Sequence, residues 1–280
     1  DGCASPEIWY AQATGNRPAQ ICGPAARAGA VNIREGAPGI MIKLIVFVSR
    51  RADLSPQAFQ AYWRDRHGPL VRGAEVTGRT LRGYVQGMTA LEAYQGDQPP
   101  AFDGTAELYF DSQADAEAFF GDPEYLERIH PDESNFADLS RCAFVATGGP
   151  EIVCGPEPAS AQGVKLVIGV KRHPDLSVAA WRDHMRNRHA ALVRDHPTSQ
   201  KYLSGYIQCF AADHAYQGGE PAVDATSELY FPDLAAMQAF LDDPAYQAEV
   251  FPDGADNADM ARTVFFPTRE EAVIPVPALA

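Results

Sequence analysis

The hydrophobic positions of this chain alternate between two periods, one typical of strands and one typical of helices. A short apolar and partly β-branched run at 43–48 predicts a strand. Ser55 followed by Pro56 predicts a helix start, because serine caps the first turn and proline loses no hydrogen bond there. Further apolar runs predict strands at 83–88, 105–110 and 142–146, and Ser112 precedes a second helix. The predicted order is βαββαβ.

The first predicted helix carries its bulky apolar residues on one side. Phe59, Trp63 and His67 follow one another at intervals of four, so their side chains project from the same face of the helix. That face is expected to pack on the sheet. We expect the helix to end near His67, because Gly68 and Pro69 follow directly. His67 is therefore predicted to lie between helix and sheet, close to the helix end.

The same pattern occurs a second time in the chain, displaced by 122 residues in its first half and by 121 after one deletion. The matched positions are Phe59 with Trp181, Trp63 with Met185, His67 with His189, Tyr84 with Tyr206, Glu107 with Glu228, Tyr109 with Tyr230, and Pro131-Asp132 with Pro252-Asp253. The chain thus contains two tandem copies of one domain. We assign 1–40 to an irregular N-terminal extension, 41–153 to the first copy, 154–163 to a linker, 164–273 to the second copy and 274–280 to a C-terminal tail.

The element order predicts the fold class, which is α+β. A βαββαβ unit folds naturally into a ferredoxin-like domain, with a four-stranded antiparallel sheet and both helices on one face. The other face of the sheet is left uncovered, and a lone copy would expose a large apolar surface. We therefore expect the two ferredoxin-like domains to pack sheet to sheet within one chain, as an intramolecular dimer. A further homodimer is left open.

Charge and composition narrow the classes of partner. The formal net charge of the 280 residues is −14, which disfavours binding to nucleic acid or to an anionic membrane. No apolar run approaches the roughly 18 residues that span a bilayer. The five cysteines are odd in number and lack metal-like spacing, which favours reduced thiols and a cytoplasmic protein. The sequence contains no cluster of histidines or cysteines with metal-ligand spacing, so no metal site is predicted.

The matched histidines are the strongest candidates for chemistry. A buried neutral imidazole can carry a proton, because its surroundings move its pKa across the working pH; the alternative is that His67 and His189 only hold the helix end through a hydrogen bond. Tyr84 and Tyr206 begin the second strand of each copy. Each can offer its hydroxyl to a substrate carbonyl or enolate, or can be an ordinary core tyrosine. The position of Tyr62 holds His184 in the second copy.

A glutamate interrupts the apolar third strand of each copy. Strand alternation places Glu107 on the same face as Tyr109, and the same applies to Glu228 and Tyr230. Each glutamate could orient the histidine or bridge the two sheets by pairing with arginine, and we favour the structural role.

These motifs resemble the EthD family of the dimeric α/β-barrel superfamily. The resemblance rests on Phe59-x-x-x-Trp63-x-x-x-His67-x-x-Leu70-Val71, Gly83-Tyr84-Val85-Gln86 and Glu107-Leu108-Tyr109-Phe110, and in the second copy on Trp181, His189, Gly205-Tyr206 and Glu228-Leu229-Tyr230-Phe231. It implies a dimeric α/β barrel formed within one chain. It also implies a cofactor-free enzyme that acts on a small aromatic, polyketide-like or lactone substrate by cyclisation, isomerisation or decarboxylation.

The resemblance also assigns roles to residues. His67 and His189 would be the general acids or bases, assisted by Tyr84 and Tyr206. The substrate pocket would be lined by Phe59, Trp63, Trp181, Met185, Glu107, Glu228, Tyr109 and Tyr230. Two other functions stay open, a non-catalytic small-molecule binder and a haem-binding barrel. Because the residues after the histidine differ between the copies, activity in only one copy is also left open.

Overall fold

The computed structural model describes residues 41–96, 98–155 and 163–277. The predicted N-terminal extension, most of the predicted linker and the last three residues of the predicted tail lie outside the described residues. Within them, nine strands form one antiparallel sheet in the order β4-β1-β3-β2-β9-β6-β8-β7-β5. The strands are β1 (Ile42–Val48), β2 (Leu81–Thr89), β3 (Gly104–Phe110), β4 (Ala143–Ala146), β5 (Glu151–Cys154), β6 (Val164–Val170), β7 (Gly205–Phe210), β8 (Ala225–Phe231) and β9 (Val264–Ile274).

At the end of each copy, the chain forms strand pairs with the other copy. The long strand β9 pairs with β6 in its own copy, through Lys165 and Thr268, and then with β2 of the first copy, through Val85 and Ala272. Strand β4 pairs with β1, and β5, which follows it directly along the chain, pairs with β7 of the second copy. The two halves of the sheet are therefore joined at β9 and again through the successive strands β4 and β5, so the sheet closes into a barrel. The predicted intramolecular dimeric α/β barrel is confirmed.

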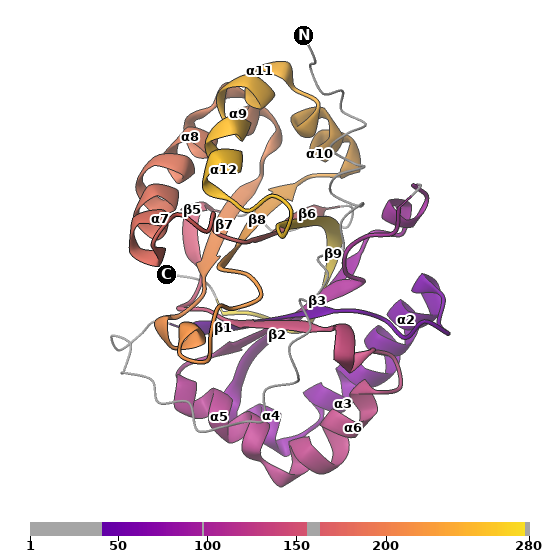
Figure 1. Cartoon of the computed structure of the whole chain (residues 1–280). Coiled ribbons are helices and arrows are strands. Elements are labelled where there is room, and N and C mark those ends of the chain that lie inside the picture. Colours follow the sequence, from indigo (N-terminus) through magenta and orange to yellow (C-terminus); the bar gives the residue numbers. More distant parts are fainter. Residues whose placement is uncertain (1–40, 97, 156–162, 278–280) are drawn as a thin grey trace.

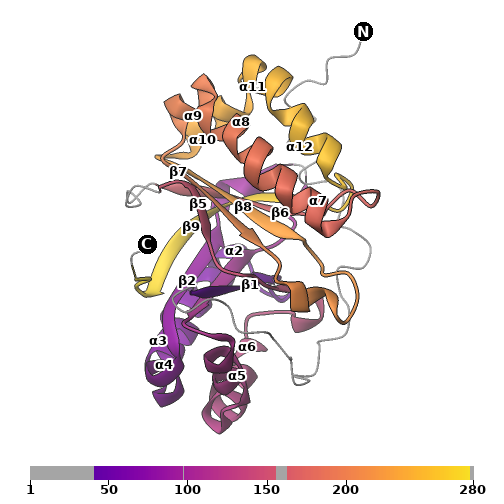
Figure 2. The same cartoon turned by 90° about the vertical axis from the view of Figure 1, so that its left-hand side faces the viewer.

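The helices cover the outside of this barrel (Figures 1 and 2). The α-helices of the first copy lie on one side and those of the second copy on the opposite side, with the strands between them. The first-copy helices are α2 (Pro56–Tyr62), η1 (Trp63–His67), α3 (Gly68–Arg72), α4 (Glu75–Thr80), η2 (Leu91–Tyr94), α5 (Gln113–Gly121), η3 (Tyr125–Ile129), α6 (His130–Glu133) and η4 (Leu139–Arg141). The second-copy helices are α7 (Val178–His184), η5 (Met185–His189), α8 (Ala190–Asp195), α9 (Pro197–Tyr202), η6 (Asp213–Tyr216), α10 (Leu234–Leu241), α11 (Pro244–Glu249) and α12 (Phe251–Asn257).

The first helix does not end at His67, contrary to our expectation. It passes through the π-helical turn η1 into α3, and the N–H of Gly68 donates to the carbonyl of Trp63, five residues earlier. The missing N–H of Pro69 costs little, because it falls in the first turn of the new α-helical segment. Proline is not the cause of the π turn, since Ala190 makes the same bond to Met185 in the second copy. Such π turns often occur at functional sites.

The barrel interior contains a buried cluster of opposite charges. Lys43 Nζ lies 2.6 Å from Glu228 of the other copy and 2.8 Å from Glu107. Lys165 pairs with Glu107 of the other copy and lies 2.5 Å from Glu270. The two glutamates thus bridge the two copies, as one of our alternatives held, but their partners are lysines and not arginines. We refer to these five residues as the interior charge cluster.

Candidate functional site

His67 is buried and His189 is mostly buried, and each histidine is hydrogen-bonded to an aspartate. His67 Nδ1 lies 2.9 Å from Asp132 Oδ2, and His189 Nδ1 lies 3.0 Å from Asp253 Oδ2. Only 6% of the His67 side chain and 12% of the His189 side chain are exposed. We did not predict the aspartates as site residues. The sequence signal that could have indicated them is the repeated Pro-Asp pair, which lies in the first turn of both α6 and α12.

The aspartate determines which nitrogen of each imidazole is available for chemistry. A carboxylate accepts the Nδ1–H, so Nε2 of the neutral ring keeps its lone pair. Among the described residues, Nε2 of neither histidine has a hydrogen-bonding partner. Burial lowers the pKa of both histidines, and the aspartates offset this only in part. Each ring is therefore a neutral base held in one orientation.

The aspartates are themselves held by further donors. Tyr62 donates its hydroxyl to Asp132 at 2.7 Å, and His184, at the matching position, lies 2.9 Å from Asp253 through Nε2. Although burial by itself would raise the pKa of both carboxyls, these hydrogen bonds and those from the buried histidines lower it. The divergence from tyrosine to histidine thus conserves the function of the side chain, which is to orient the carboxylate.

The lowered histidine pKa values predict that acid weakens the fold. Because each folded-state pKa lies below the ordinary value of about 6.5, the unfolded chain binds more protons, and the unfolding free energy falls as the pH decreases from about 6.5. The aspartates contribute only below about pH 4. Each histidine adds at most about 1.4 kcal/mol per pH unit.

Urea unfolding at pH 7.5 and 5.5 measures this effect. The doubly substituted His67→Gln/His189→Gln protein should lose less stability between the two pH values than the wild type. An equal loss in both proteins would contradict the neutral, buried state of the rings.

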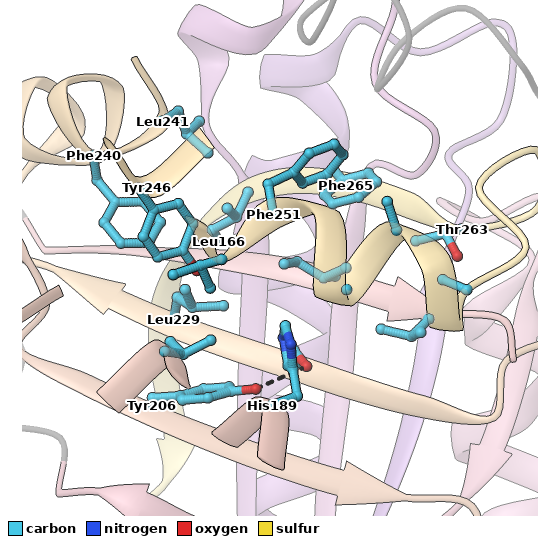
Figure 3. Close-up of a pocket in the computed structure, with 18 of the residues that line it drawn as sticks. Leu166, His189, Tyr206, Leu229, Phe240, Leu241, Tyr246, Phe251, Thr263 and Phe265 are labelled. Atoms are coloured by element: carbon cyan, nitrogen blue, oxygen red, sulfur yellow. Dashed lines mark hydrogen bonds between the residues drawn. The ribbon is translucent and has the colours of Figure 1, made fainter. Parts of the chain in front are cut away.

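A cavity of about 90 Å³ lies in the second copy, between the sheet and the helices α10 to α12. Its walls are mostly apolar and aromatic, and His189, Tyr206 and Ser227 are among its few polar side chains. The Tyr206 hydroxyl and the His189 ring lie at the same end of the cavity, as Figure 3 shows. The structure therefore brings together the histidine and tyrosine that we predicted for this copy.

Side-chain size explains how the second copy forms this cavity. Met185, which lines it, stands where the first copy has Trp63. Ala137 and Ala258 form equivalent β-bridges, to Arg50 and Arg172. The residues that precede them, Phe136 and Asn257, therefore also occupy matching positions of the two copies. In the first copy the Phe136 ring lies 4.9 Å from His67 and 5.9 Å from Trp63, between ring centroids. The aromatic pair thus packs around His67, and its counterparts in the second copy are smaller.

Gly254 opens the reactive edge of His189. A Cβ at this position would lie 3.1 Å from Cε1 and 3.7 Å from Nε2 of the imidazole. The first copy has Glu133 at the matching position of the repeat. The absence of a side chain at 254 therefore leaves part of the cavity next to the nitrogen that carries the lone pair.

The two predicted tyrosines differ in their hydrogen bonds. The Tyr84 hydroxyl accepts one from Trp63 Nε1 at 3.0 Å and one from Gln86 at 3.2 Å. The Tyr206 hydroxyl accepts one from Gln208 at 2.7 Å and lies 3.5 Å from Ser227 Oγ. Burial raises the pKa of Tyr206 to about 12, so its hydroxyl stays protonated at neutral pH.

Most of the predicted pocket residues do not line this cavity. Phe59 and Trp63 pack in the core beneath α2 and η1, and Trp181 packs in the corresponding core beneath α7. The predicted pocket residues on the third strands are Glu107, Tyr109, Glu228 and Tyr230. They surround or belong to the interior charge cluster, because strand alternation turns them to the sheet face opposite the histidines. Of our predicted pocket residues, only Met185 lines the cavity.

The described residues include no helix that is long and apolar enough to cross a membrane. In the same part of the chain, no three or more His, Cys, Asp or Glu side chains are grouped so that they could hold a metal ion.

Comparison with solved structures places the fold among known proteins. An anthrone oxidase-like protein is 11% identical, with a TM-score of 0.57 over 86% of this chain and 97% of that chain. A protein of Fusobacterium nucleatum, provisionally described as a monooxygenase, is 7% identical, with a TM-score of 0.52 over 83% and 94%. A mutant chlorite dismutase from Candidatus Nitrospira defluvii is 11% identical, with a TM-score of 0.44 over 82% and 91%. At these identities the likeness to the first two proteins shows the fold alone.

Comparison of the sequence with curated proteins found no significant match. The family model of the EthD domain matches twice, at residues 51–140 and 173–261, which together make up more than half of the chain. Each match contains one of the two histidines and its aspartate. The chain therefore belongs to the EthD family and carries two EthD domains in tandem.

Proposed function

We propose that the second EthD domain is a cofactor-free proton-transfer enzyme for a small, mainly apolar molecule that carries a ring oxygen or carbonyl. The observation that carries this proposal is the cavity of about 90 Å³ that is lined by both His189 and Tyr206. An apolar cavity with a few convergent polar groups and a titratable residue of shifted pKa is the arrangement expected of a small-molecule site.

The chemistry follows from the two side chains. Asp253 holds the Nδ1–H of His189, so Nε2 can accept a proton from a carbon next to a carbonyl group. The Tyr206 hydroxyl, whose pKa of about 12 keeps it protonated, can donate to the oxygen on which negative charge develops. Returning the proton at another atom would isomerise the molecule. Cyclisation and decarboxylation pass through similar enolate-like states, so the reaction class stays within these three.

The size of the cavity bears on the two other functions, haem binding and non-catalytic binding. Ligand pockets of drug-sized molecules measure about 300–1,000 Å³, so a cavity of about 90 Å³ does not fit a haem macrocycle. Haem binding is therefore not proposed. A non-catalytic binder would use the same cavity, and only an assay of proton transfer separates it from an enzyme.

Hydrogen–deuterium exchange tests the proposal, because it reports removal of the α-proton whichever of the three reactions follows. Cyclohexanone, cyclopentanone and δ-valerolactone are incubated in D₂O with the full chain, and loss of the α-proton signal is followed by NMR. We expect the protein to accelerate exchange above the buffer rate. Because burial lowers the pKa of His189, the rate should stay constant at neutral pH and should fall only at a pH below about 6.5. Binding without any acceleration would contradict the enzyme and favour the binder.

A further inference from the structure

The hydroxyls of Tyr206 and Ser227 form an incomplete pair in the wall of the cavity. Both residues are buried, with exposed fractions of 1% and 5%. Their oxygens are 3.5 Å apart, whereas a good O–H···O bond measures about 2.7–2.8 Å. Among the described residues, the Ser227 hydroxyl has no closer partner. A buried hydroxyl without a good acceptor costs roughly 1–3 kcal/mol, so an acceptor brought between the two would be favoured.

Gln208 determines the direction in which the Tyr206 proton points. Its Nε2 donates to the Tyr206 oxygen at 2.7 Å and to the Met185 carbonyl at 3.4 Å. With Nε2 held in this way, the tyrosine oxygen acts as the acceptor toward Gln208. The phenolic proton is therefore left for Ser227 or for a ligand in the cavity.

The first copy shows what the same position looks like without this pair. In the first copy Ala106 pairs with Gln86, and in the second copy Ser227 pairs with Gln208. Ala106 and Ser227 therefore occupy matching positions. The Tyr84 oxygen accepts from Trp63 as well as from Gln86, and the Trp63 indole lies against it. Loss of the tryptophan donor and gain of the serine hydroxyl thus occur together in the copy that has the described cavity.

The size and polarity of the cavity limit the rest of the ligand. An apolar cavity of about 150 Å³ accepts benzene, so about 90 Å³ leaves room for no more than one ring. The lining also includes Leu229, Phe240 and Val250, which offer only apolar contact. This volume and lining favour an uncharged ligand with a single ring.

From this geometry we infer that the Tyr206 and Ser227 hydroxyls together bind the single acceptor oxygen of a one-ring ketone or lactone, and that Ser227 determines this specificity. The inference rests on the proposed function for the location of the site, and it narrows the substrate class from small apolar molecules with a ring oxygen or carbonyl to one-ring ketones and lactones. It also places the ligand oxygen away from Gln208 and beside His189, where an α-carbon could reach the imidazole.

Binding measurements on the full chain test this without reference to turnover. Cyclohexanone is compared with methylenecyclohexane, which has the same shape but no oxygen, and with the two-ring 1-tetralone. We expect cyclohexanone to bind most tightly. One net hydrogen bond contributes about 0.5–1.5 kcal/mol, so Ser227→Ala should weaken cyclohexanone binding by roughly two- to tenfold and leave methylenecyclohexane unchanged. Ala106→Ser, the matched change in the first copy, should have no effect.

Three outcomes would overturn the inference: equal binding of cyclohexanone and methylenecyclohexane, tighter binding of 1-tetralone, or unchanged cyclohexanone binding by the Ser227→Ala protein. Alanine is the residue that the first copy carries at this position, and thermal melting verifies that the variant folds. The result is separable from that of the exchange assay. Oxygen-dependent binding without exchange would contradict the enzyme alone, and exchange that is independent of Ser227 would contradict the recognition site alone.

Discussion

Replacement of His189 by glutamine is expected to lower the rate of cyclohexanone α-proton exchange by about 10²–10⁴-fold, the usual contribution of a general acid or base. Glutamine keeps polar atoms at the site but cannot accept a proton at neutral pH. His67→Gln is the matched control. This variant also removes an imidazole that is hydrogen-bonded to an aspartate and little exposed. The His67 ring, however, packs in an aromatic group with Phe136 and Trp63. We expect the His67→Gln protein to retain the wild-type exchange rate.

A second variant separates loss of chemistry from loss of structure. Gly254→Ala adds a single methyl group 3.1 Å from His189 Cε1 and retains both the imidazole and its aspartate. Alanine favours the helical conformation of α12 over glycine, which offsets part of the cost of this tight contact, while access to Nε2 is reduced. Exchange should therefore fall in this protein as well. Thermal melting measures whether the fold is retained. Wild-type exchange rates in both His189→Gln and Gly254→Ala would remove the second-copy cavity as the active site.

Replacement of Lys43 by methionine is expected to lower the unfolding free energy by about 3–5 kcal/mol, the loss typical of removing one partner of a buried ion pair. Lys43 is 1% exposed and neutralises Glu107 and Glu228 from opposite halves of the barrel. Burial opposes the charge on Lys43, but the two carboxylates outweigh it and raise its pKa. Without the lysine, two buried carboxylates would share Lys165. Urea unfolding, followed by tryptophan fluorescence and circular dichroism, measures the loss.

Two controls identify the origin of this loss. Arg269 pairs with Glu92 at 2.8 Å, but 39% and 50% of the two side chains are exposed. Arg269→Met should therefore cost no more than about 1 kcal/mol. The double variant Lys43→Met/Glu228→Met removes a whole pair, and replacing a buried pair by apolar residues is often close to neutral. It should be more stable than Lys43→Met alone. A cost below about 1 kcal/mol for Lys43→Met would show that water or neighbouring groups compensate the cluster.

Local pattern was a good guide to the elements and a poor guide to their ends. The capping serines Ser55 and Ser112 begin helices as predicted, because an N-cap depends on a hydrogen bond only three residues away. The predicted helix end at Gly68 and Pro69 was wrong. A π turn shifts the hydrogen bonds by one residue before Pro69, so the helix continues. This turn occurs in both copies without a common Gly-Pro pair, so these residue types did not indicate it.

The candidate site was predicted in part. Helical spacing placed His67 and His189 on inward faces, and only 6% and 12% of the two side chains are exposed. The aspartate that orients each ring lies 64 or 65 residues further along the chain, where no helical or strand period connects it to the histidine. Alternation put the glutamates on one face with their tyrosines, but it could not tell whether that face met the helices or the barrel interior. The glutamates and tyrosines that we assigned to the substrate pocket do not line the cavity beside His189.

The sequence by itself determined the duplication, the βαββαβ order and the inward side of each first helix, because repeats and periodicities are properties of neighbouring positions. The tertiary structure decided three further features: the exchange of strand ends that closes the barrel, the pairing of each histidine with its aspartate, and the cavity beside His189. Each depends on side chains or strands that are distant along the chain. Their contacts arise only when the packed helices and the two sheets bring them within hydrogen-bonding distance, and the volumes of Trp63 and Met185 then set how much space is left.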